Sequence, residues 1–113
     1  MKILFLTHDL HRAGAQIYLL RLLKWLKKNK PHVTLHLISF GKGKLKKDFE
    51  LHVPVSMWKE TKKHFFITKT FELNLQGFLD SFQPDVVYNN TWMNGIKINS
   101  ISFSCPVITH VHE

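Results

Sequence analysis

The sequence predicts one three-layer α/β domain, with a parallel sheet between two layers of helices. Short apolar runs typical of strands alternate with amphipathic stretches typical of helices along all 113 residues. No internal repeat, low-complexity tract or linker interrupts the alternation. With 44% hydrophobic and 21% charged residues, the chain has the composition of a domain that buries a core without disulfides. We expect a single domain over residues 1–113, and its ending directly after an apolar run leads us to expect a fragment of a longer protein.

The first forty residues predict strand, helix and strand. Ile3 to Leu6 is an unbroken apolar run, typical of a central strand covered on both faces. From Ala15 to Lys28, leucines recur on one side and basic residues on the other, which predicts an amphipathic helix that ends before Pro31. Val33 to Phe40 alternates and then becomes fully apolar. It predicts a second strand, parallel to the first through a right-handed crossover.

The middle of the chain is less regular. Gly41 to Lys44 predicts a loop, Lys46 to Leu51 one helical turn, and Val53 to Trp58 a short strand. Aromatic and leucine residues then recur at helical spacing from Phe65 to Phe82, and Gln83 to Asp85 ends this second helix. Such a stripe indicates a helix packed in the core and not a platform on which bases stack.

The last part of the chain returns to the alternation. Val86 to Tyr88 predicts a short strand, and Asn90 or Thr91 is a suitable cap for a helix that runs to about Ser102. Pro106 to Val111 then predicts a final strand, opened by its proline. Each element is thus followed by one of the other kind, as in parallel α/β folds.

Basic residues outnumber acidic residues, at 16 against 8, which gives a net charge of +8. This excess favours phosphate-rich partners, namely anionic lipid, nucleic acid or nucleotides. The lysines that contribute most are Lys24, Lys27, Lys28, Lys42, Lys44, Lys46 and Lys47. They form either a merely solvated face or a surface for an anionic membrane, and Trp25 on the same helix favours the membrane over nucleic acid.

The sequence contains few features that indicate the cellular compartment of the protein. No window approaches the roughly 18 apolar residues of a membrane span, and the first residues do not read as a signal peptide. The single cysteine, Cys105, cannot form an internal disulfide, which favours a reducing compartment. We expect a cytoplasmic protein, peripheral on a membrane if it binds one. Asn89 to Thr91 matches a glycosylation sequon, but we expect it to cap a helix or bind a ligand instead.

Polar residues follow three of the predicted strands: residues 8–14, residues 89–91 and residues 110–113. In open parallel sheets, ligands bind beyond the carboxyl ends of the strands, where helix N-termini point their free N–H groups outward. We therefore expect the three clusters to share one edge of the sheet. Gly14, just before the first helix, either lets backbone donors approach a phosphate or serves only the turn from strand to helix. Neither a dinucleotide-binding nor a P-loop glycine pattern is present.

Two histidines close the last cluster. His110 and His112 are two residues apart, so on a strand they would face the same side, while Glu113 would face the other. Such a pair is able to bind metal or to act as acid and base, but it also fits one histidine packed under a helix and one at the strand end. A metal site built with His8 and His11 lacks a carboxylate at ligand spacing, so we expect no metal.

Five segments together resemble family 4 glycosyltransferases over nearly the whole chain. They are Lys2 to Asp9 with its KILFLTHD pattern, Gly14 to Gln16 before a leucine-rich helix, Gly43 to Glu50, Pro84 to Thr91, and Pro106 to Glu113. The sequence departs from the family at two places. Ala13 with Gly14 stands where a glycine pair is common, and Gly43 to Leu45 stands where Gly-Pro-Leu is usual.

The resemblance implies a GT-B enzyme of two Rossmann-like domains, of which this chain is the N-terminal, acceptor-binding one. Such an enzyme transfers a sugar from a nucleotide sugar to an acceptor with retention of configuration and without a metal or other cofactor. Gly14 would contact the donor diphosphate and His112 would lie beside the transferred sugar. Most donor contacts, and the family's paired glutamates, would belong to the missing C-terminal domain, so residues 1–113 alone are predicted to be inactive.

The remaining candidate substrate-binding residues are His8, Asn90, Thr91 and Glu113. Two other classes of function stay open on the residues alone. The first is a non-catalytic α/β module whose basic face binds anionic lipid or nucleic acid, with steep salt dependence. The second is a metal-dependent hydrolase built on the histidines, which would carry stoichiometric zinc.

Overall fold

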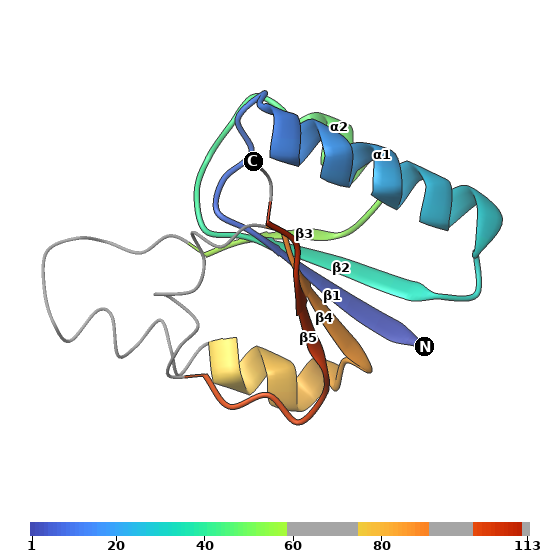
Figure 1. Cartoon of the computed structure of the whole chain (residues 1–113), viewed down its shortest axis with the longest axis vertical. Coiled ribbons are helices and arrows are strands. Elements are labelled where there is room, and N and C mark those ends of the chain that lie inside the picture. The colour runs from blue at the N-terminus through green and yellow to red at the C-terminus, as the bar shows by residue number, and fades with distance from the viewer. Residues whose placement is uncertain (59–74, 91–100, 112–113) are drawn as a thin grey trace, which may run out of the picture.

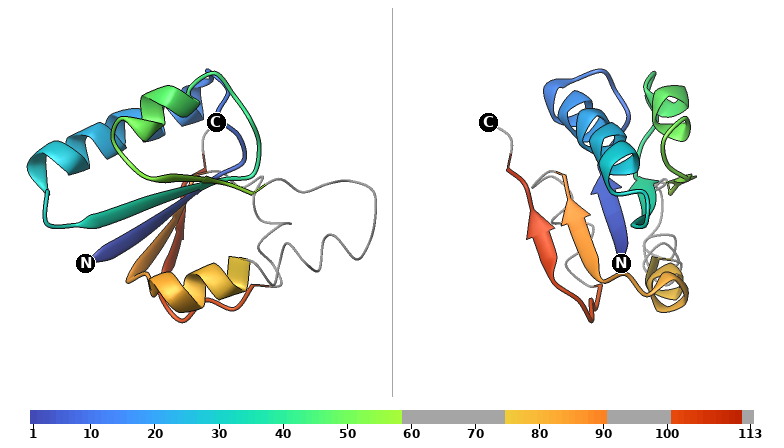
Figure 2. Two further views of the ribbon diagram at one scale, coloured as in Figure 1. Left: turned by 180° about the vertical axis from the view of Figure 1, so that it is seen from behind. Right: turned by 90° about the vertical axis from the view of Figure 1, so that its right-hand side faces the viewer.

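A computed structural model describes residues 1–58, 75–90 and 101–111. In chain order the elements are β1 (Lys2–Thr7), α1 (Gly14–Asn29), β2 (Thr34–Ser39), α2 (Lys46–Glu50), β3 (Val55–Met57), a helical segment at residues 75–82, β4 (Val86–Asn89) and β5 (Val107–Thr109). The strands form one parallel sheet in the order β3-β2-β1-β4-β5. Figures 1 and 2 show α1 and α2 on one side of this sheet and the segment 75–82 on the other. The predicted three-layer α/β fold is confirmed.

The apolar run at the start of the chain forms the centre of the sheet, as predicted. β1 pairs with β2 on one side and with β4 on the other, so that Leu4 lies opposite both His36 and Val87. Because side chains alternate along a strand, Leu4 and Leu6 face one helical layer while Phe5 faces the other. All three side chains are buried. A strand covered on both faces needs apolar residues at every position, and this explains the unbroken run.

The layer of α1 and α2 covers the face that contains Phe5. Leu19 and Leu23 of α1 are fully buried there, and Phe49 of α2 packs in the same cluster with Leu37 of β2. Replacing such a buried leucine with alanine costs about 2–5 kcal/mol of stability. The basic residues of α1 are exposed, as the amphipathic pattern predicts.

The helical segment 75–82 covers the other face, with Leu75 and Leu79 buried against Leu4 and Leu6. Phe78 and Phe82 stack on each other with ring centroids 5.4 Å apart. His36 of β2 lies with its ring 4.8 Å from Phe78 and 5.7 Å from Phe82. Its Nε2 lies 2.8 Å from the hydroxyl of Ser56, and burial lowers the pKa of the imidazole.

The predicted helix from Asn90 or Thr91 to about Ser102 is wrong at its end. Residues 101–103 are not helical, because the side chain of Gln76 holds the backbone of Ser102 there. Gln76 Nε2 donates to the Ser102 carbonyl at 2.9 Å, and the Ser102 N–H donates to Gln76 Oε1 at 3.0 Å. The rest of that predicted helix, at residues 91–100, lies outside the described residues, as does the 65–74 part of the preceding one.

The last strand is shorter than predicted. β5 ends at Thr109, so Val111 and His110 lie beyond it. The described partner of β5 is β4, which itself ends at Asn89, opposite Thr109. With no further ladder partner in β4, the strand stops. Its side chains are exposed at the edge of the sheet, unlike those of β1.

The described part of the chain holds no helix that is both long and apolar enough to span a membrane.

Candidate functional site

The candidate site is the edge of the sheet at the carboxyl ends of its strands, which we call the carboxyl edge. It comprises the β1–α1 loop at residues 8–13, the N-terminus of α1, the β2–α2 loop at residues 41–45, Asn89 at the end of β4 with Asn90 just after it, and His110 just after β5. Figure 1 shows the start of α1 above the ends of the strands. The polar clusters predicted to share one edge do meet there as far as the structure describes them.

Asp9 organises the β1–α1 loop. Its Oδ1 accepts the amide of Gln16 at 2.6 Å and the backbone N–H of His11 at 3.0 Å. Its Oδ2 lies 3.1 Å from His8 Nε2, and Thr7 Oγ1 donates to its backbone carbonyl. The carboxylate therefore joins the loop to the first turn of α1.

Gln16 and Asp9 were not among the candidate site residues predicted from the sequence. Gln16 is 2% exposed and is the buried polar residue of α1. The signal available in the sequence was a polar residue at a position where the leucine stripe demands an apolar one. Gln16 Oε1 and His8 Nδ1 are buried without a hydrogen-bond partner. One of these atoms lies in the β1–α1 loop and the other in the first turn of α1, so this junction is the polar part of the carboxyl edge.

The β2–α2 loop supports the β1–α1 loop from behind. The N–H of Leu10 donates to the carbonyl of Lys42 at 3.3 Å, and the N–H of Leu45 donates to that of Leu10 at 3.0 Å. A Cβ on Gly43 would lie 1.9 Å from the carbonyl carbon of Leu10, and one on Gly41 would lie 2.8 Å from the carbonyl oxygen of His8. The two loops approach so closely that only glycine fits at Gly43.

Gly14 differs from the loop glycines because nothing inside the described chain requires it. A Cβ at this position would meet no atom within 4 Å, and no described glycine has a positive φ. Gly14 is the first residue of α1, and the preceding Ala13 provides no side-chain cap. The first turn also contains no acidic residue. The helix therefore offers uncapped N–H groups next to open space, an arrangement that suits an anion.

Asn90 lies beside the start of α1. Its side-chain amide donates to the carbonyl of Ala15 at 3.0 Å, and its backbone N–H donates to Leu6 at 2.9 Å. The side chain is fully buried. Gly14 and Asn90, far apart in the sequence, are therefore neighbours in the fold. Thr91, His112 and Glu113 lie outside the described residues.

His110 packs between two tyrosines. Its Nδ1 lies 2.6 Å from the hydroxyl of Tyr88, and its ring meets that of Tyr18 on α1 edge to face at 5.0 Å. Burial first, and then the neighbouring Tyr18, raises the pKa of Tyr88. This packing under a helix was one of the two interpretations of His110. The other interpretation was a pair with His112 that binds metal or acts as acid and base, and His112 lies outside the described residues. The expected place of His110 on the last strand is wrong, because β5 ends at Thr109.

Within residues 1–58, 75–90 and 101–111, no three histidine, cysteine, aspartate or glutamate side chains are placed to hold a metal ion. His8 and His11 both approach Asp9, at 3.1 and 4.0 Å from its Oδ2. His110, the third described member of the histidine set, is engaged with Tyr88 instead.

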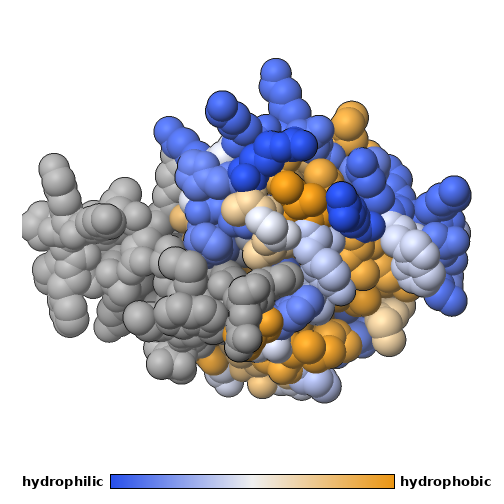
Figure 3. Space-filling view, turned by 45° about the horizontal axis from the view of Figure 1, so that its top comes forward, coloured by the Kyte–Doolittle hydropathy of each residue, from blue (hydrophilic) through white to orange (hydrophobic). Residues whose placement is uncertain are grey.

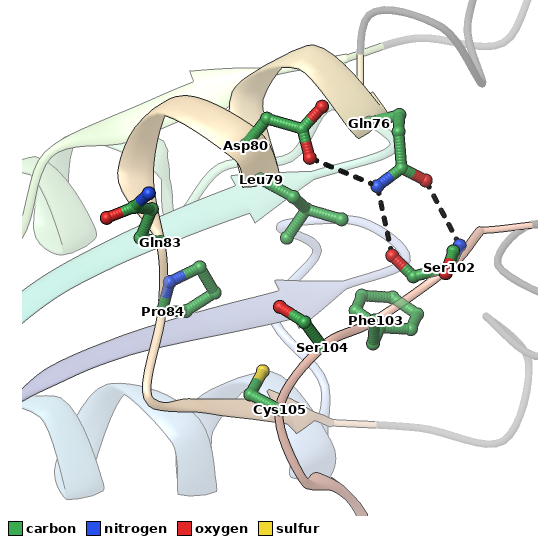
Figure 4. Close-up of a pocket in the computed structure, with 9 residues that line it drawn as sticks. All are labelled: Gln76, Leu79, Asp80, Gln83, Pro84, Ser102, Phe103, Ser104 and Cys105. Carbon is green, nitrogen blue, oxygen red and sulfur yellow. Dashed lines mark hydrogen bonds between the residues drawn. The ribbon is translucent and has the colours of Figure 1, made fainter.

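A hollow of about 250 Å³ lies elsewhere, between the segment 75–82 and residues 101–105 (Figure 4). Gln83 and Pro84 line it just before β4, and Cys105 just before β5, so it lies at the amino ends of these strands. Burial is the main cause that raises the pKa of the Cys105 thiol, which keeps it protonated at neutral pH. The hollow lacks the uncapped helix start and the polar loops of the carboxyl edge, so we place the site at that edge.

No family model matches the chain, and no curated protein matches it in sequence. Solved structures with the same fold include the following three. The lipopolysaccharide outer core galactosyltransferase WaaB, in its apo form, matches 97% of this chain and 33% of its own, with a TM-score of 0.72 and 16% identity. HepE of Anabaena, in a complex with UDP and glucose, matches 100% of this chain and 30% of its own, with a TM-score of 0.70 and 21% identity.

The third structure is MurG of Acinetobacter baumannii, which matches 98% of this chain and 35% of its own, with a TM-score of 0.59 and 9% identity. The chain thus spans about a third of the length of each of these proteins. At these identities the likeness establishes the fold. It is the α/β, Rossmann-like fold found in GT-B glycosyltransferases.

Proposed function

We propose that the chain is the N-terminal, acceptor-side domain of a retaining GT-B glycosyltransferase of family 4. The full-length enzyme transfers a sugar from a nucleotide sugar to an acceptor. The observation that carries the proposal is the uncapped, open start of α1 at the carboxyl edge of a sheet whose fold matches glycosyltransferases over the whole chain. The UDP and glucose in the HepE structure support a nucleotide-sugar donor, which the missing C-terminal domain would hold in large part.

The donor diphosphate is the ligand proposed for the α1 N-terminus. Gly14 lets the diphosphate approach the first N–H groups, and the helix dipole stabilises the negative charge without a metal. The open space at Gly14 supports this, because neither packing nor backbone conformation explains a glycine there. His8, Asn90, Thr91 and Glu113 are proposed to bind the substrates, and His112 to lie beside the transferred sugar.

Gly14→Val tests the donor site in the full-length enzyme. A branched side chain would project into the space proposed for the diphosphate, so we expect at least about a tenfold rise in donor Kd, measured by calorimetry with UDP sugars. Gly14→Ala is the matched control, and its smaller side chain is expected to have a smaller effect. An unchanged Kd in Gly14→Val would remove Gly14 from the donor site.

His112→Ala tests the reacting end of the site. Losing a group that contacts the transferred sugar in the transition state is expected to lower kcat about 100-fold while the unfolding midpoint stays the same. His32→Ala provides the control, because His32 is exposed at the opposite end of the sheet, just before β2. A wild-type kcat in His112→Ala would contradict the proposal.

Residues 1–113 alone are proposed to have no transferase activity, because most donor contacts belong to the other domain. Robust turnover by this chain by itself would refute that point. A cytoplasmic location is also proposed, since the single cysteine and a nucleotide-sugar substrate both fit a reducing compartment.

A second candidate function follows from the charge of +8. In it, the domain has no catalytic role and binds anionic lipid or nucleic acid through its basic face. Full-length protein that binds such polyanions but shows no affinity for any nucleotide sugar would favour this candidate.

A further inference from the structure

The chain just after β5 is held by contacts that β5 itself does not provide. β5 has three residues, and the side chains of all three are exposed. Its described ladder partner is β4. A short, exposed strand does little to order the chain beyond it, because fixing each backbone residue has an entropic cost that contacts must offset. The position of the chain after Thr109 therefore depends on the contacts of His110.

Two other elements contact His110. Its backbone N–H donates to the carbonyl of Asn89 at 2.9 Å, which joins it to the end of β4. Its Nδ1 lies 2.6 Å from the hydroxyl of Tyr88, also on β4. Its ring meets the ring of Tyr18 on α1 edge to face, with centroids 5.0 Å apart. Both the backbone and the side chain of His110 are thus held.

Tyr88 is itself anchored in the core. Its ring lies 5.4 Å from that of Phe5 on the central strand and packs against the buried cluster under α1. Because burial is the first cause that raises the pKa of Tyr88, its hydroxyl keeps its proton at neutral pH. With this hydroxyl as donor, Nδ1 of His110 is the acceptor, and the neutral imidazole carries its proton on Nε2. The core thereby orients the imidazole.

Tyr18 brings the start of α1 into the same group of contacts. It stands four residues after Gly14, and positions at this spacing are neighbours on a helix surface. Tyr18 is 48% exposed, on the side of the molecule that Figure 3 shows, where hydrophilic side chains lie around apolar ones. Asn90, after β4, donates to the carbonyl of Ala15 in the same part of the helix. His110 is therefore held beside the first two turns of α1.

We propose that Tyr88, His110 and Tyr18, which we call the edge cluster, are positioning residues that fix the chain after β5 relative to the start of α1. The inference rests on the proposed function, in which His112 acts two residues after His110 and Gly14 admits the donor diphosphate. Both groups act on one donor molecule, so their separation must be fixed. A misplacement of about 1 Å costs up to about 100-fold in rate.

A role in stability alone explains the edge cluster less well. Tyr18 is about half exposed and His110 is half-buried, so their contact removes little apolar surface from water. A hydrogen bond between neutral groups also adds only modestly to stability. What these contacts supply to His110 is a fixed orientation.

The test measures UDP release from UDP-glucose and UDP-galactose by the full-length enzyme, with water as the acceptor, and donor Kd in parallel by calorimetry. Tyr88→Phe removes the hydroxyl and keeps the ring that packs on Phe5. We expect kcat to fall about tenfold while the donor Kd stays within about twofold of the wild type, because the start of α1 is untouched. A loss of stability alone would not separate kcat from Kd in this way. Circular dichroism at the assay temperature verifies the fold.

Tyr18 provides a second variant, at a position where truncation spares the core. Tyr18→Ala removes the ring that meets His110 and is expected to lower kcat about as much as Tyr88→Phe. Tyr18→Phe keeps that ring and is expected to lose less. The matched control is Ser56→Ala, which removes the hydroxyl 2.8 Å from the ring of His36, among the aromatic side chains of the opposite layer. Its kcat is expected to equal that of the wild type.

A wild-type kcat in both Tyr88→Phe and Tyr18→Ala would overturn the inference and leave the proposed function standing. An equal loss of kcat in Ser56→Ala would also overturn it, since any lost hydroxyl contact would then have the same effect. Wild-type enzyme that neither binds nor turns over these two donors would count against the proposed function itself, and the inference would fall with it.

Discussion

Two glycines lie at the carboxyl edge for different reasons: Gly43 in the β2–α2 loop, and Gly14 at the first position of α1. A Cβ on Gly43 would lie 1.9 Å from the backbone of Leu10, so the packing of the loops requires glycine. A Cβ on Gly14 would meet nothing within 4 Å, and its φ is not positive. The difference separates a glycine that the packing of the loops requires from one that neither the described contacts nor the backbone angle requires. In the sequence the two look alike.

The largest expected difference is in the free energy of unfolding of the alanine variants of the two glycines. Gly43→Ala must displace the backbone of Leu10, which we expect to cost about 3 kcal/mol of unfolding free energy. Gly14→Ala has room and occupies the first position of a helix, so we expect no loss and a gain of up to about 1 kcal/mol. Urea unfolding of both variants measures the two changes. Equal destabilisation by both would abolish the distinction.

Asp9 holds the β1–α1 loop that leads to Gly14. Removing the Asp9 carboxylate is expected to cause the next largest loss of stability. Asp9→Ala leaves the amide of buried Gln16 and the N–H of His11 without an acceptor. An unsatisfied buried group costs about 1–3 kcal/mol, so we expect a loss of about 2 kcal/mol in urea unfolding. The double variant Asp9→Ala with Gln16→Leu removes both partners.

That double variant is expected to recover much of the lost stability, because an apolar side chain at position 16 would extend the buried leucine stripe of α1. Failure of Gln16→Leu to restore any stability would show that the Asp9 carboxylate acts through other contacts. Donor binding is expected to stay impaired in both variants, since the loop before Gly14 loses its anchor.

The smallest expected effect comes from His36, which is half-buried among aromatic rings, in comparison with the exposed His32. Burial lowers the pKa of His36 below its unfolded value of about 6.5, so the folded state binds fewer protons than the unfolded state. The stability that neutral His36 provides is complete above about pH 6.5 and is lost as the pH falls through the folded pKa. His36→Gln is expected to remove this part of the pH dependence, measured as the unfolding midpoint between pH 7.5 and 5.

Exposed His32→Gln is the control for that measurement and is expected to leave the pH profile as in the wild type. An unchanged profile in His36→Gln would mean that the aromatic surroundings of Phe78 and Phe82 do not oppose the charged imidazole.

Local pattern predicted most of the described fold. The unbroken run at β1 identified the central strand, the leucine stripe identified α1, and proline and glycine marked where elements end. Where the local pattern was insufficient, contacts between residues distant in the sequence set the end of an element. Gln76 prevents a helix at Ser102, and the length of β4 limits β5 to Thr109.

The candidate site was predicted in part. The sequence placed Gly14, His8 and Asn90 at the ends of strands, and the contact of Asn90 with Ala15 brings two of these regions together. It did not identify Asp9 as the anchor of the loop, nor Gln16 as its buried partner. A carboxylate in a polar loop and a glutamine at a helix start are common, so neither stands out without the hydrogen bond that joins them.

Local sequence pattern was enough to predict the order of the described strands, the central position of β1 and the charge of the outer helical surface. These depend on residue type and on periods of two and 3.6 residues, which are local properties of the chain. The folded arrangement was needed to show that packing requires Gly43, that the Asp9 carboxylate anchors the loop and that β5 ends at Thr109. Each of these depends on two segments that are distant in sequence approaching within a few ångströms, and no local pattern encodes that distance.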